Sequence, residues 1–398
     1  MKVMHLNDHY EQVGGAESIL FHTLGALEEQ GIVNVVVHQH PTKLKETRRR
    51  VYQVPHMGDV ISPKSSRVAA TFREILDKER PDLIHLYDIG NPDIAEMSCR
   101  YGPTVQSVLN HSFYCPGGGK YLPFLGRTCL RPLGPGCLAS AFLTHCNSVR
   151  PHILFSSYLR STRMLRRKAP LLFLALSHYQ ADCLFQSGYP ADRVKVLPPF
   201  TDLPELSATT HSLSREATLL FTGRIVPGKG LDVLLRALPY VRSSFRLLVD
   251  GAGSDFERTK TLALKLGLGD RVQFVGWSPP EQHQANYLQA SIVLVPSVWP
   301  EPFGLVGIEG MSYTKPVVAF RVGGIPDWLE DGTTGFLIPP GDLKGMAEKI
   351  DFLLQNPKTA HQMGEMGRKK VEAEFSKEVY MRRLLEIYNG LLPLPTRF

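Results

Sequence analysis

Two glutamates, Glu301 and Glu309, stand on either side of a Pro-Phe-Gly turn in the second half of the chain. The apolar run 292–295 that precedes them has the length and the β-branched composition of a buried parallel strand. Because proline and glycine at 302 and 304 interrupt a regular helix, we expect Glu301 on a loop at the carboxyl end of that strand. A helix that begins near Gly304 would place Glu309 about one to two turns further on.

This segment could bind a ligand that carries both hydroxyl groups and an anion. Glu301 can accept hydrogen bonds from hydroxyl groups, the first N–H groups of the helix can bind an anion, and Glu309 supplies a second carboxylate. A nucleotide sugar presents sugar hydroxyls, a diphosphate and ribose hydroxyls in the same order. The alternative interpretation is a turn followed by an exposed helix, because two glutamates at a fixed spacing also occur by chance.

A second segment, Gly223-Arg-Ile-Val-Pro-Gly-Lys-Gly230, follows another predicted strand. Arg224 can fork onto phosphate oxygens and Lys229 can supply a point charge, so together they can neutralise a diphosphate. The segment does not end in the Gly-Lys-Ser/Thr sequence of a Walker A loop. The alternative is a surface turn with solvated cations.

The rest of the chain alternates predicted strands and helices, which indicates an α/β fold with parallel sheets. Leu197–Pro204 is proline-rich and precedes a Ser/Thr-rich stretch, so it predicts a linker between two domains. We expect domains at 1–200 and 205–376, with an amphipathic C-terminal helix at about 377–398. The predicted strands are Lys2–Leu6, Val33–His38, Leu83–Tyr87, Val105–Leu109, Leu171–Leu176, Thr218–Thr222, Arg246–Val249, Val272–Val275, Ile292–Val295 and Val317–Phe320.

The segments 223–230 and 301–309 resemble the G-R-x-x-x-x-K-G and E-x7-E motifs of the retaining glycosyltransferases of family 4. The resemblance covers nearly the whole chain. It implies the GT-B fold, in which two Rossmann-like domains with parallel sheets face a central cleft. It also implies that the first domain binds an acceptor, that the second binds a nucleotide-sugar donor, and that the C-terminal helix packs back on the first domain.

The resemblance assigns roles to individual residues. Glu301 would contact the donor sugar and Glu309 the ribose. His111 would lie at the edge of the cleft and help to hold the sugar or phosphate, although Ser112 stands where many relatives have aspartate. With Arg224 and Lys229, the catalytic set is Glu301, His111, Arg224 and Lys229. The other donor-binding residues would be Gly14, Gly15, Gly251, Val275, Trp277, Phe303, Gly304, Leu305 and Glu309.

The glycine-rich stretch Val13–Glu17 follows the first predicted strand and should lead into a helix at about Ser18. The turn 250–253 is not a full G-x-G-x-x-G motif, because Phe256 occupies the third glycine position. The family usually has glycine where this chain has Val249. Main-chain groups near 275–277 would meet the nucleobase, so the base is not evident from side chains.

The resemblance also implies transfer with retention, in which the acceptor hydroxyl attacks from the face that the diphosphate leaves. The donor would be a UDP-, GDP- or ADP-sugar, and the product a polysaccharide, glycolipid or glycoconjugate. We expect no cofactor and no catalytic metal, because Asp-x-Asp is absent and Arg224 and Lys229 can replace a cation. The alternatives are a sugar-nucleotide epimerase or phosphorylase of the same fold, a non-catalytic nucleotide-sugar binder, or a nucleic-acid-binding protein.

The charge distribution bears on the partner. The net charge is +7, and all of it lies in residues 1–200, which hold 23 basic and 16 acidic residues against 22 of each in 201–398. Between Glu96 and Asp182 there are ten basic residues and no acidic one. Such a field favours an anionic, lipid-linked or glycan acceptor, or an anionic membrane. Nucleic acid is not expected, because aromatic residues do not alternate with the cations.

The stretch 160–168 mixes cations with leucine and methionine. It predicts either a helix that rests on an anionic bilayer or a solvated helix. We expect no signal peptide, because the apolar run at Met1–Asn7 is too short for one. The longest apolar stretch, 169–176, is far below the roughly 20 residues that span a bilayer. We therefore expect a cytoplasmic protein, with the inner face of the membrane as one location.

Four cysteines, Cys115, Cys129, Cys137 and Cys146, lie within 32 residues. Four thiolates could bind a structural Zn²⁺, but no C-x2-C spacing supports this. The alternative is reduced cysteines without a ligand, and disulfides are disfavoured in the cytosol.

Overall fold

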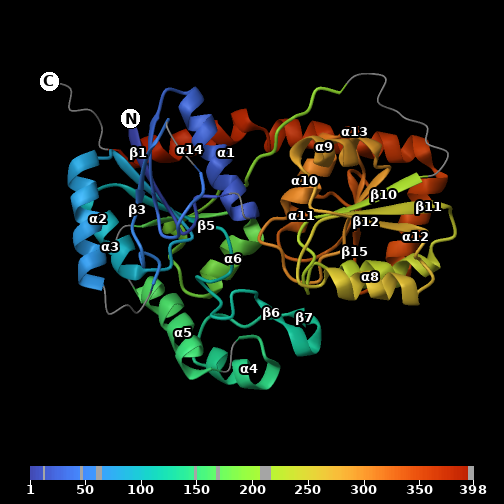
Figure 1. Cartoon of the computed structure of the whole chain (residues 1–398), viewed down its shortest axis with the longest axis horizontal. Coiled ribbons are helices and arrows are strands. Elements are labelled where there is room, and N and C mark those ends of the chain that lie inside the picture. The colour runs from blue at the N-terminus through green and yellow to red at the C-terminus, as the bar shows by residue number, and fades with distance from the viewer. Residues whose placement is uncertain are drawn as a thin grey trace. The chain divides into compact units, whose positions relative to one another are not determined.

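A computed structural model describes residues 1–11, 14–44, 48–59, 65–147, 150–166, 171–206 and 217–392. Five of the predicted features lie partly outside these residues. They are the glycine-rich stretch at Val13, the Ser/Thr-rich stretch after Pro204, the basic stretch at 167–168, the apolar stretch at 169–170 and the C-terminal helix at 393–398. The chain divides into two compact units. The first comprises Met1–Pro199 with the C-terminal part from Glu378, and the second comprises Phe200–Lys377 (Figure 1).

The first unit contains a sheet of seven parallel strands in the order β3-β2-β1-β4-β5-β8-β9. The order reverses between β1 and β4, as in a doubly wound fold. The strands are β1 (Lys2–Asn7), β2 (Val33–His38), β3 (Arg50–Gln53), β4 (Leu83–Tyr87), β5 (Thr104–Val108), β8 (Leu172–Ala175) and β9 (Val194–Val196), and a separate antiparallel hairpin joins β6 (Tyr121–Leu122) to β7 (Arg127–Thr128).

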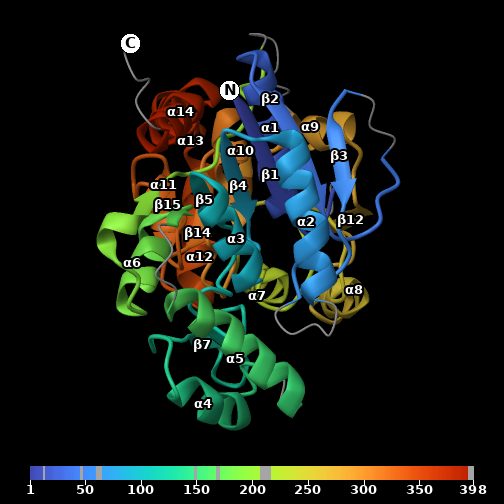
Figure 2. The ribbon, with the colours of Figure 1, turned by 90° about the vertical axis from the view of Figure 1, so that its left-hand side faces the viewer.

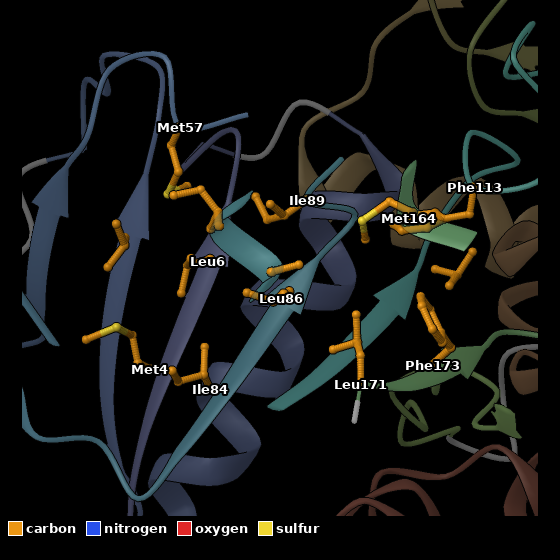
Figure 3. Packing of buried hydrophobic residues seen from close by; sticks show 14 of the residues in the cluster. Met4, Leu6, Met57, Ile84, Leu86, Ile89, Phe113, Met164, Leu171 and Phe173 are labelled. Carbon is orange, nitrogen blue, oxygen red and sulfur yellow. The ribbon is translucent and has the colours of Figure 1, made fainter. Parts of the chain in front are cut away.

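Helices connect these strands (Figures 1 and 2). They are α1 (Gly15–Glu29), α2 (Ser65–Glu79), α3 (Pro92–Tyr101), α4 (Gly136–Thr144), α5 (Pro151–Arg166) and α6 (His178–Gln186), with short 3-10 turns η1 (Pro123–Leu125) and η2 (Ala191–Arg193). One core cluster of the unit combines strand side chains with helix side chains. Figure 3 shows Met4 and Leu6 of β1 beside Ile84 and Leu86 of β4 in this cluster.

The C-terminal helix α14 (Lys377–Leu391) belongs to the first unit. Two buried tyrosines of α14 form hydrogen bonds with the rest of the first unit. The Tyr380 hydroxyl lies 2.9 Å from the Thr23 hydroxyl, and the Tyr388 hydroxyl lies 2.6 Å from Nδ1 of His85. Burial lowers the pKa of His85 well below its usual value, so its ring is neutral and can accept from Tyr388.

The second unit contains six parallel strands in the order β12-β11-β10-β13-β14-β15. The strands are β10 (Ala217–Thr222), β11 (Phe245–Asp250), β12 (Val272–Gly276), β13 (Ile292–Val295), β14 (Val317–Phe320) and β15 (Gly335–Ile338). The helices are α7 (Leu231–Ala237), α8 (Phe256–Lys265), α9 (Pro280–Gln289), α10 (Leu305–Ser312), α11 (Ile325–Trp328), α12 (Leu343–Gln355) and α13 (Pro357–Glu374), with a 3-10 turn η3 (Leu238–Tyr240).

Candidate functional site

The segments 223–230 and 296–304 meet in the second unit. The first follows β10 and the second follows β13. The strand order reverses between these two strands, and open α/β sheets bind ligands beyond the carboxyl ends of strands at such a point. The backbone N–H groups of Val298 and Trp299 donate to the carbonyl oxygen of Gly228, at 2.9 and 3.1 Å. These bonds fix one loop against the other.

Glycine at 230 permits this close approach. Gly230 has φ +74°, and a Cβ atom there would lie 1.8 Å from the carbonyl oxygen of Pro296. Any other residue would therefore push the two loops apart. Gly323 likewise permits a close approach to segment 296–304, because a Cβ atom at this position would lie 2.2 Å from the carbonyl oxygen of Glu301.

Lys229 and Glu301, one from each loop, form an ion pair. The Lys229 Nζ atom donates to Glu301 Oε1 at 2.6 Å, and the Ser297 hydroxyl donates to the same oxygen at 2.5 Å. The ammonium group also lies 5.5 Å from the centre of the Trp299 ring. Glu301 is buried, whereas the Lys229 side chain keeps 22% of its surface exposed. The cation can therefore reach a ligand while it holds the carboxylate.

The charge of Glu301 depends on these neighbours. Burial alone would raise the pKa of its carboxyl group, but the positive charge of Lys229 and hydrogen bonds from Lys229, Ser297 and Trp299 outweigh burial. The pKa consequently lies below its usual value. An ionised carboxylate beside a partly exposed ammonium group can accept from hydroxyls while the cation faces an anion.

Arg224 lies at the start of the first loop and is exposed. The next residue anchors the loop, because the Ile225 N–H group donates to the Ala252 carbonyl oxygen at 2.8 Å. An exposed guanidinium group on an anchored backbone is available to an anion.

Helix α10 begins at Leu305, directly after Gly304, which has φ +99° and caps it. Phe303 is buried, and its carbonyl oxygen accepts from the Trp328 indole at 2.8 Å. Its ring is therefore a packing group in this structure. The Gly307 N–H group donates to the Gly304 carbonyl oxygen at 3.1 Å, whereas the N–H groups of Leu305 and Val306 precede this bond and can face a ligand.

Glu309 accepts a hydrogen bond from α9, and a second hydrogen-bonded group lies beside that donor. The buried Tyr287 hydroxyl of α9 donates to Glu309 Oε2 at 2.8 Å. The Tyr287 ring lies edge-on to His283, at 5.1 Å between centres. His283 Nδ1 lies 2.8 Å from Oδ2 of Asp250 at the end of β11, and Asn286 donates to the same oxygen at 2.9 Å. The side-chain hydrogen bond that Glu309 accepts thus comes from α9.

The Asp250–His283 pair shifts both pKa values. Its hydrogen bond to Asp250 raises the pKa of His283 against the effect of burial. Burial would raise the pKa of Asp250, but hydrogen bonds from His283, Asn286 and Ser278 lower it below its usual value. Both shifts favour the charged forms.

The predicted base-binding residues lie at the ends of β11 and β12. Gly251 approaches the first loop so closely that a Cβ atom would lie 1.9 Å from the Gly223 carbonyl oxygen. Its N–H group donates to the Gly276 carbonyl oxygen at 2.7 Å. Val275 and Trp277 are exposed, the latter with 64% of its surface. Nothing in these contacts selects one base.

The sequence prediction missed several residues of this site. Ser297 and Trp299 adjoin Glu301, so their position within the motif could have indicated them. Asp250 ends a predicted strand, and the carboxyl end of a parallel strand is a signal for function. His283 and Tyr287 gave no signal, because a single histidine or tyrosine on a helix is ordinary.

In the first unit, α1 begins at Gly15 rather than at about Ser18. The earlier start arises because Gly14 is the N-cap, and both the N–H group and the hydroxyl of Ser18 donate to its carbonyl oxygen at 3.1 Å. A ligand role of Gly14 and Gly15 stays a prediction.

His111 follows β5 and is fully buried. Its Nδ1 atom contacts the Tyr114 hydroxyl, and its carbonyl oxygen accepts from the N–H groups of Tyr114 and Cys115, at 3.1 and 2.8 Å. These contacts give His111 a structural role in closing a turn. Its proposed contact with sugar or phosphate stays a prediction.

The four clustered cysteines, Cys115, Cys129, Cys137 and Cys146, line one pocket in the first unit. All six cysteines are free thiols. Within the described ranges, no three cysteine, histidine or acidic side chains are grouped so as to hold a metal ion. Whether these cysteines stay unliganded or bind a structural metal remains a prediction.

Arg160, Arg163 and Arg166 of the basic stretch lie on α5. In the part of the chain that the structure describes, no helix is long and apolar enough to cross a bilayer.

Two family models match consecutive parts of the chain. A model described as Glycosyltransferase Family 4 matches residues 13–205, and one described as Glycosyl transferases group 1 matches residues 204–370. The boundary between them falls close to the division between the two units.

Curated relatives match over about half of their length. A D-inositol 3-phosphate glycosyltransferase of Corynebacterium efficiens is 33% identical over 208 residues, which is 47% of this chain and 47% of that relative. An uncharacterized glycosyltransferase of Methanocaldococcus jannaschii is 31% identical over 172 residues, which is 43% of this chain and 48% of the relative. The chain thus spans about half the length of the curated relatives it matches.

Solved structures share the fold over the full length. Sucrose-phosphate synthase from Thermosynechococcus elongatus superposes with a TM-score of 0.75 at 22% identity and covers 98% of each chain. Anabaena HepE in complex with UDP-glucose superposes with a TM-score of 0.74 at 19% identity, over 98% of this chain and 100% of HepE. With its two parallel α/β units and the two matching family models, the chain belongs to the family 4 type of glycosyltransferases with the GT-B fold.

Proposed function

We propose that this protein transfers a sugar from a nucleoside-diphosphate sugar to an acceptor hydroxyl group, with retention of the anomeric configuration. The observation that carries the proposal is the Lys229–Glu301 ion pair between the two motif loops. It sets a cation for phosphate beside a buried ionised carboxylate for hydroxyls. The UDP-glucose complex of HepE, a protein of the same fold, supports a nucleotide sugar as the ligand.

In this proposal, Arg224, Lys229 and the start of α10 stabilise the negative charge of the departing diphosphate without a metal ion. Glu301 orients the sugar, and Glu309 accepts from the ribose hydroxyls. The acceptor hydroxyl attacks on the face that the diphosphate leaves, and a diphosphate oxygen takes its proton. The new glycosidic bond forms as the bond from the sugar to the diphosphate breaks, so nucleoside diphosphate and glycoside are the only products.

The acceptor is anionic in this proposal. Residues 97–181 contain ten basic and no acidic residues, which favours a phosphorylated or uronic acceptor. The relatives named D-inositol 3-phosphate glycosyltransferase make an inositol phosphate one acceptor to test.

The test combines the purified protein with UDP-, GDP- and ADP-glucose and with inositol 3-phosphate or a uronic acid. Release of nucleoside diphosphate that requires an acceptor would support transfer, and an NMR spectrum of an α-linked product from an α-linked donor would support retention. An inverted product would contradict the retaining mechanism. Conversion of the nucleotide sugar into its epimer, with no release of diphosphate, would replace transfer with epimerisation.

A further inference from the structure

One segment of the first unit turns its large apolar side chains outward. Among the described residues, seven of the eighteen exposed large apolar side chains fall within residues 124–155. Leu130 keeps 84% of its surface exposed, Phe124 78% and Leu143 74%. We call the set the exposed apolar surface; its members are Phe124, Leu125, Leu130, Phe142, Leu143, Ile153 and Phe155.

These side chains come from elements that pack together. Turn η1 contacts α4, and α4 contacts α5. Both views of the molecule place α4 further from the parallel strands of the first unit than α5 (Figures 1 and 2). The exposed apolar surface therefore belongs to one projecting part of the first unit and not to scattered positions. Apolar side chains gathered in this way mark an interaction site.

The interior of the same segment contains few apolar side chains. In the described part of residues 115–155, Ala141 and Leu154 are the buried hydrophobic residues, while Lys120 and Ser140 are buried polar residues. Four cysteines line the pocket that these elements enclose. Burial of a Phe or Leu side chain stabilises a fold by about 1.5–3 kcal/mol. The exposed phenylalanines and leucines of this segment do not contribute that stabilisation to the fold. Their presence is therefore explained better by contact with an external partner than by folding.

The charge around the exposed apolar surface identifies the kind of partner. No acidic residue occurs between Glu96 and Asp182. Three arginines within this segment are exposed, namely Arg127, Arg131 and Arg150, and Arg163 and Arg166 are exposed further along α5. Apolar side chains surrounded by cations match a bilayer with anionic headgroups, since the rings enter the acyl boundary while the arginines meet the phosphates. A second copy of the chain would bring cations against cations.

We propose that the exposed apolar surface docks the first unit on an anionic membrane. The docking places the protein beside acceptors that are held in the bilayer, but it does not depend on the reaction proposed above. The contact combines two contributions with separate signatures. The arginine contribution weakens as salt screens it, whereas the apolar contribution persists.

The experiment measures co-sedimentation of the full chain with vesicles of phosphatidylcholine alone and of phosphatidylcholine with phosphatidylglycerol. We expect binding to the anionic vesicles at low salt and much weaker binding to the neutral ones. The variant Phe124→Ser/Phe142→Ser should weaken partitioning by about tenfold for each side chain. The control variant, Tyr240→Ser/Leu264→Ser, removes two exposed apolar side chains of the second unit and should bind as the wild type does.

Two outcomes would overturn the proposal. Equal weak binding of wild type and Phe124→Ser/Phe142→Ser to anionic vesicles would remove the exposed apolar surface from membrane contact. A dimer of the wild type in light scattering that this variant converts to a monomer would identify a second copy as the occupant. Because the replaced side chains are exposed, the variants should keep the wild-type circular dichroism spectrum and unfolding midpoint. Nucleotide-sugar binding is measured separately, so failure of docking and failure of sugar transfer are distinguishable.

Discussion

At the scale of single residues, the site is defined by charges that hold one another in place. Glu301 is buried and would be protonated more easily without Lys229, whose charge and hydrogen bond keep its pKa below the usual value. A buried carboxylate paired with a cation that is still 22% exposed is a costly arrangement for stability alone. In the reaction that we propose, it presents an acceptor for hydroxyls next to a donor for phosphate.

Replacement of Glu301 by glutamine should separate sugar handling from nucleotide binding. The amide has nearly the shape of the carboxylate but lacks its charge, so we expect a loss of about 100-fold or more in kcat for transfer. The Kd for nucleoside diphosphate, measured by calorimetry, should change little. The control is Glu330→Gln, which breaks an exposed ion pair with Lys370 on the same unit. Equal losses of transfer and nucleotide affinity in Glu301→Gln would refute the role in orienting the sugar.

His283 should make the stability of the second unit depend on pH. Its folded-state pKa is raised by the hydrogen bond to Asp250, so the stabilisation is complete below the unfolded-state pKa of about 6.5. That stabilisation disappears as the pH rises through the higher folded-state value. The Tm of wild type should therefore exceed that of His283→Gln most at acidic pH, and the gap should narrow toward alkaline pH. A Tm difference that stays constant with pH would show that the Asp250–His283 pair does not titrate in this way. The control is His361→Gln, which changes a histidine on the surface of α13.

At the scale of elements, the site depends on how closely two loops approach. Segment 223–230 after β10 and segment 296–304 after β13 are in contact because Gly228 and Gly230 lack side chains. The same feature explains why the motif is rich in glycine: the backbone of one loop occupies the space that a Cβ atom would need.

Gly230→Ala should therefore be far more harmful than a glycine replacement of similar backbone conformation. Gly267 has φ +69°, close to the +74° of Gly230, but a Cβ atom there meets nothing within 4 Å. We expect Gly267→Ala to cost about 1 kcal/mol, the ordinary penalty of a left-handed alanine. Gly230→Ala should cost at least about 3 kcal/mol, because a Cβ at 1.8 Å from the Pro296 oxygen adds a steric clash. Urea unfolding followed by tryptophan fluorescence measures both, and equal costs would contradict the account.

The sequence predicted the elements that carry this site well. All ten predicted strands are found to within one residue at either end, because buried parallel strands are mostly apolar runs. Five of the described strands were missed. The strands β3, β9 and β15 have three or four residues and lie at sheet edges, and β6 and β7 have two residues each. The Lys229–Glu301 contact follows from two strand ends at one switch point. The contacts of His283 with Asp250 and of Tyr287 with Glu309 could not be predicted, since both depend on the rotation of α9.

At the scale of the whole molecule, the chain forms two units, and only the second is continuous in sequence. The first unit requires α14, which returns to it from the end of the second. Buried side chains on this helix, among them Leu384 and Tyr388, have no exposed surface. The hydrogen bond from Tyr388 to His85 adds a polar anchor in this buried contact.

A chain that stops after Ser376 should keep the second unit and lose the first. All three tryptophans, Trp277, Trp299 and Trp328, lie in the second unit, so tryptophan fluorescence reports on it alone. Far-ultraviolet circular dichroism reports on both units. We expect tryptophan fluorescence of the truncated chain to show thermal unfolding at the same temperature as in the wild type. Below that temperature, the ellipticity of the truncated chain should be much smaller than that of the wild type. A truncated chain with a wild-type circular dichroism transition would contradict the dependence of the first unit on α14.

The central claim is that the loop after β10 holds the diphosphate of a nucleotide sugar in the second unit. Calorimetric titration of UDP, GDP and ADP into the wild type and into Arg224→Ala/Lys229→Ala tests it most directly. One of the three should bind the wild type, and the double variant should raise its Kd by about 100-fold or more, because two charge-assisted contacts are lost. An unchanged Kd in the folded double variant, or the absence of binding by all three diphosphates, would contradict the claim.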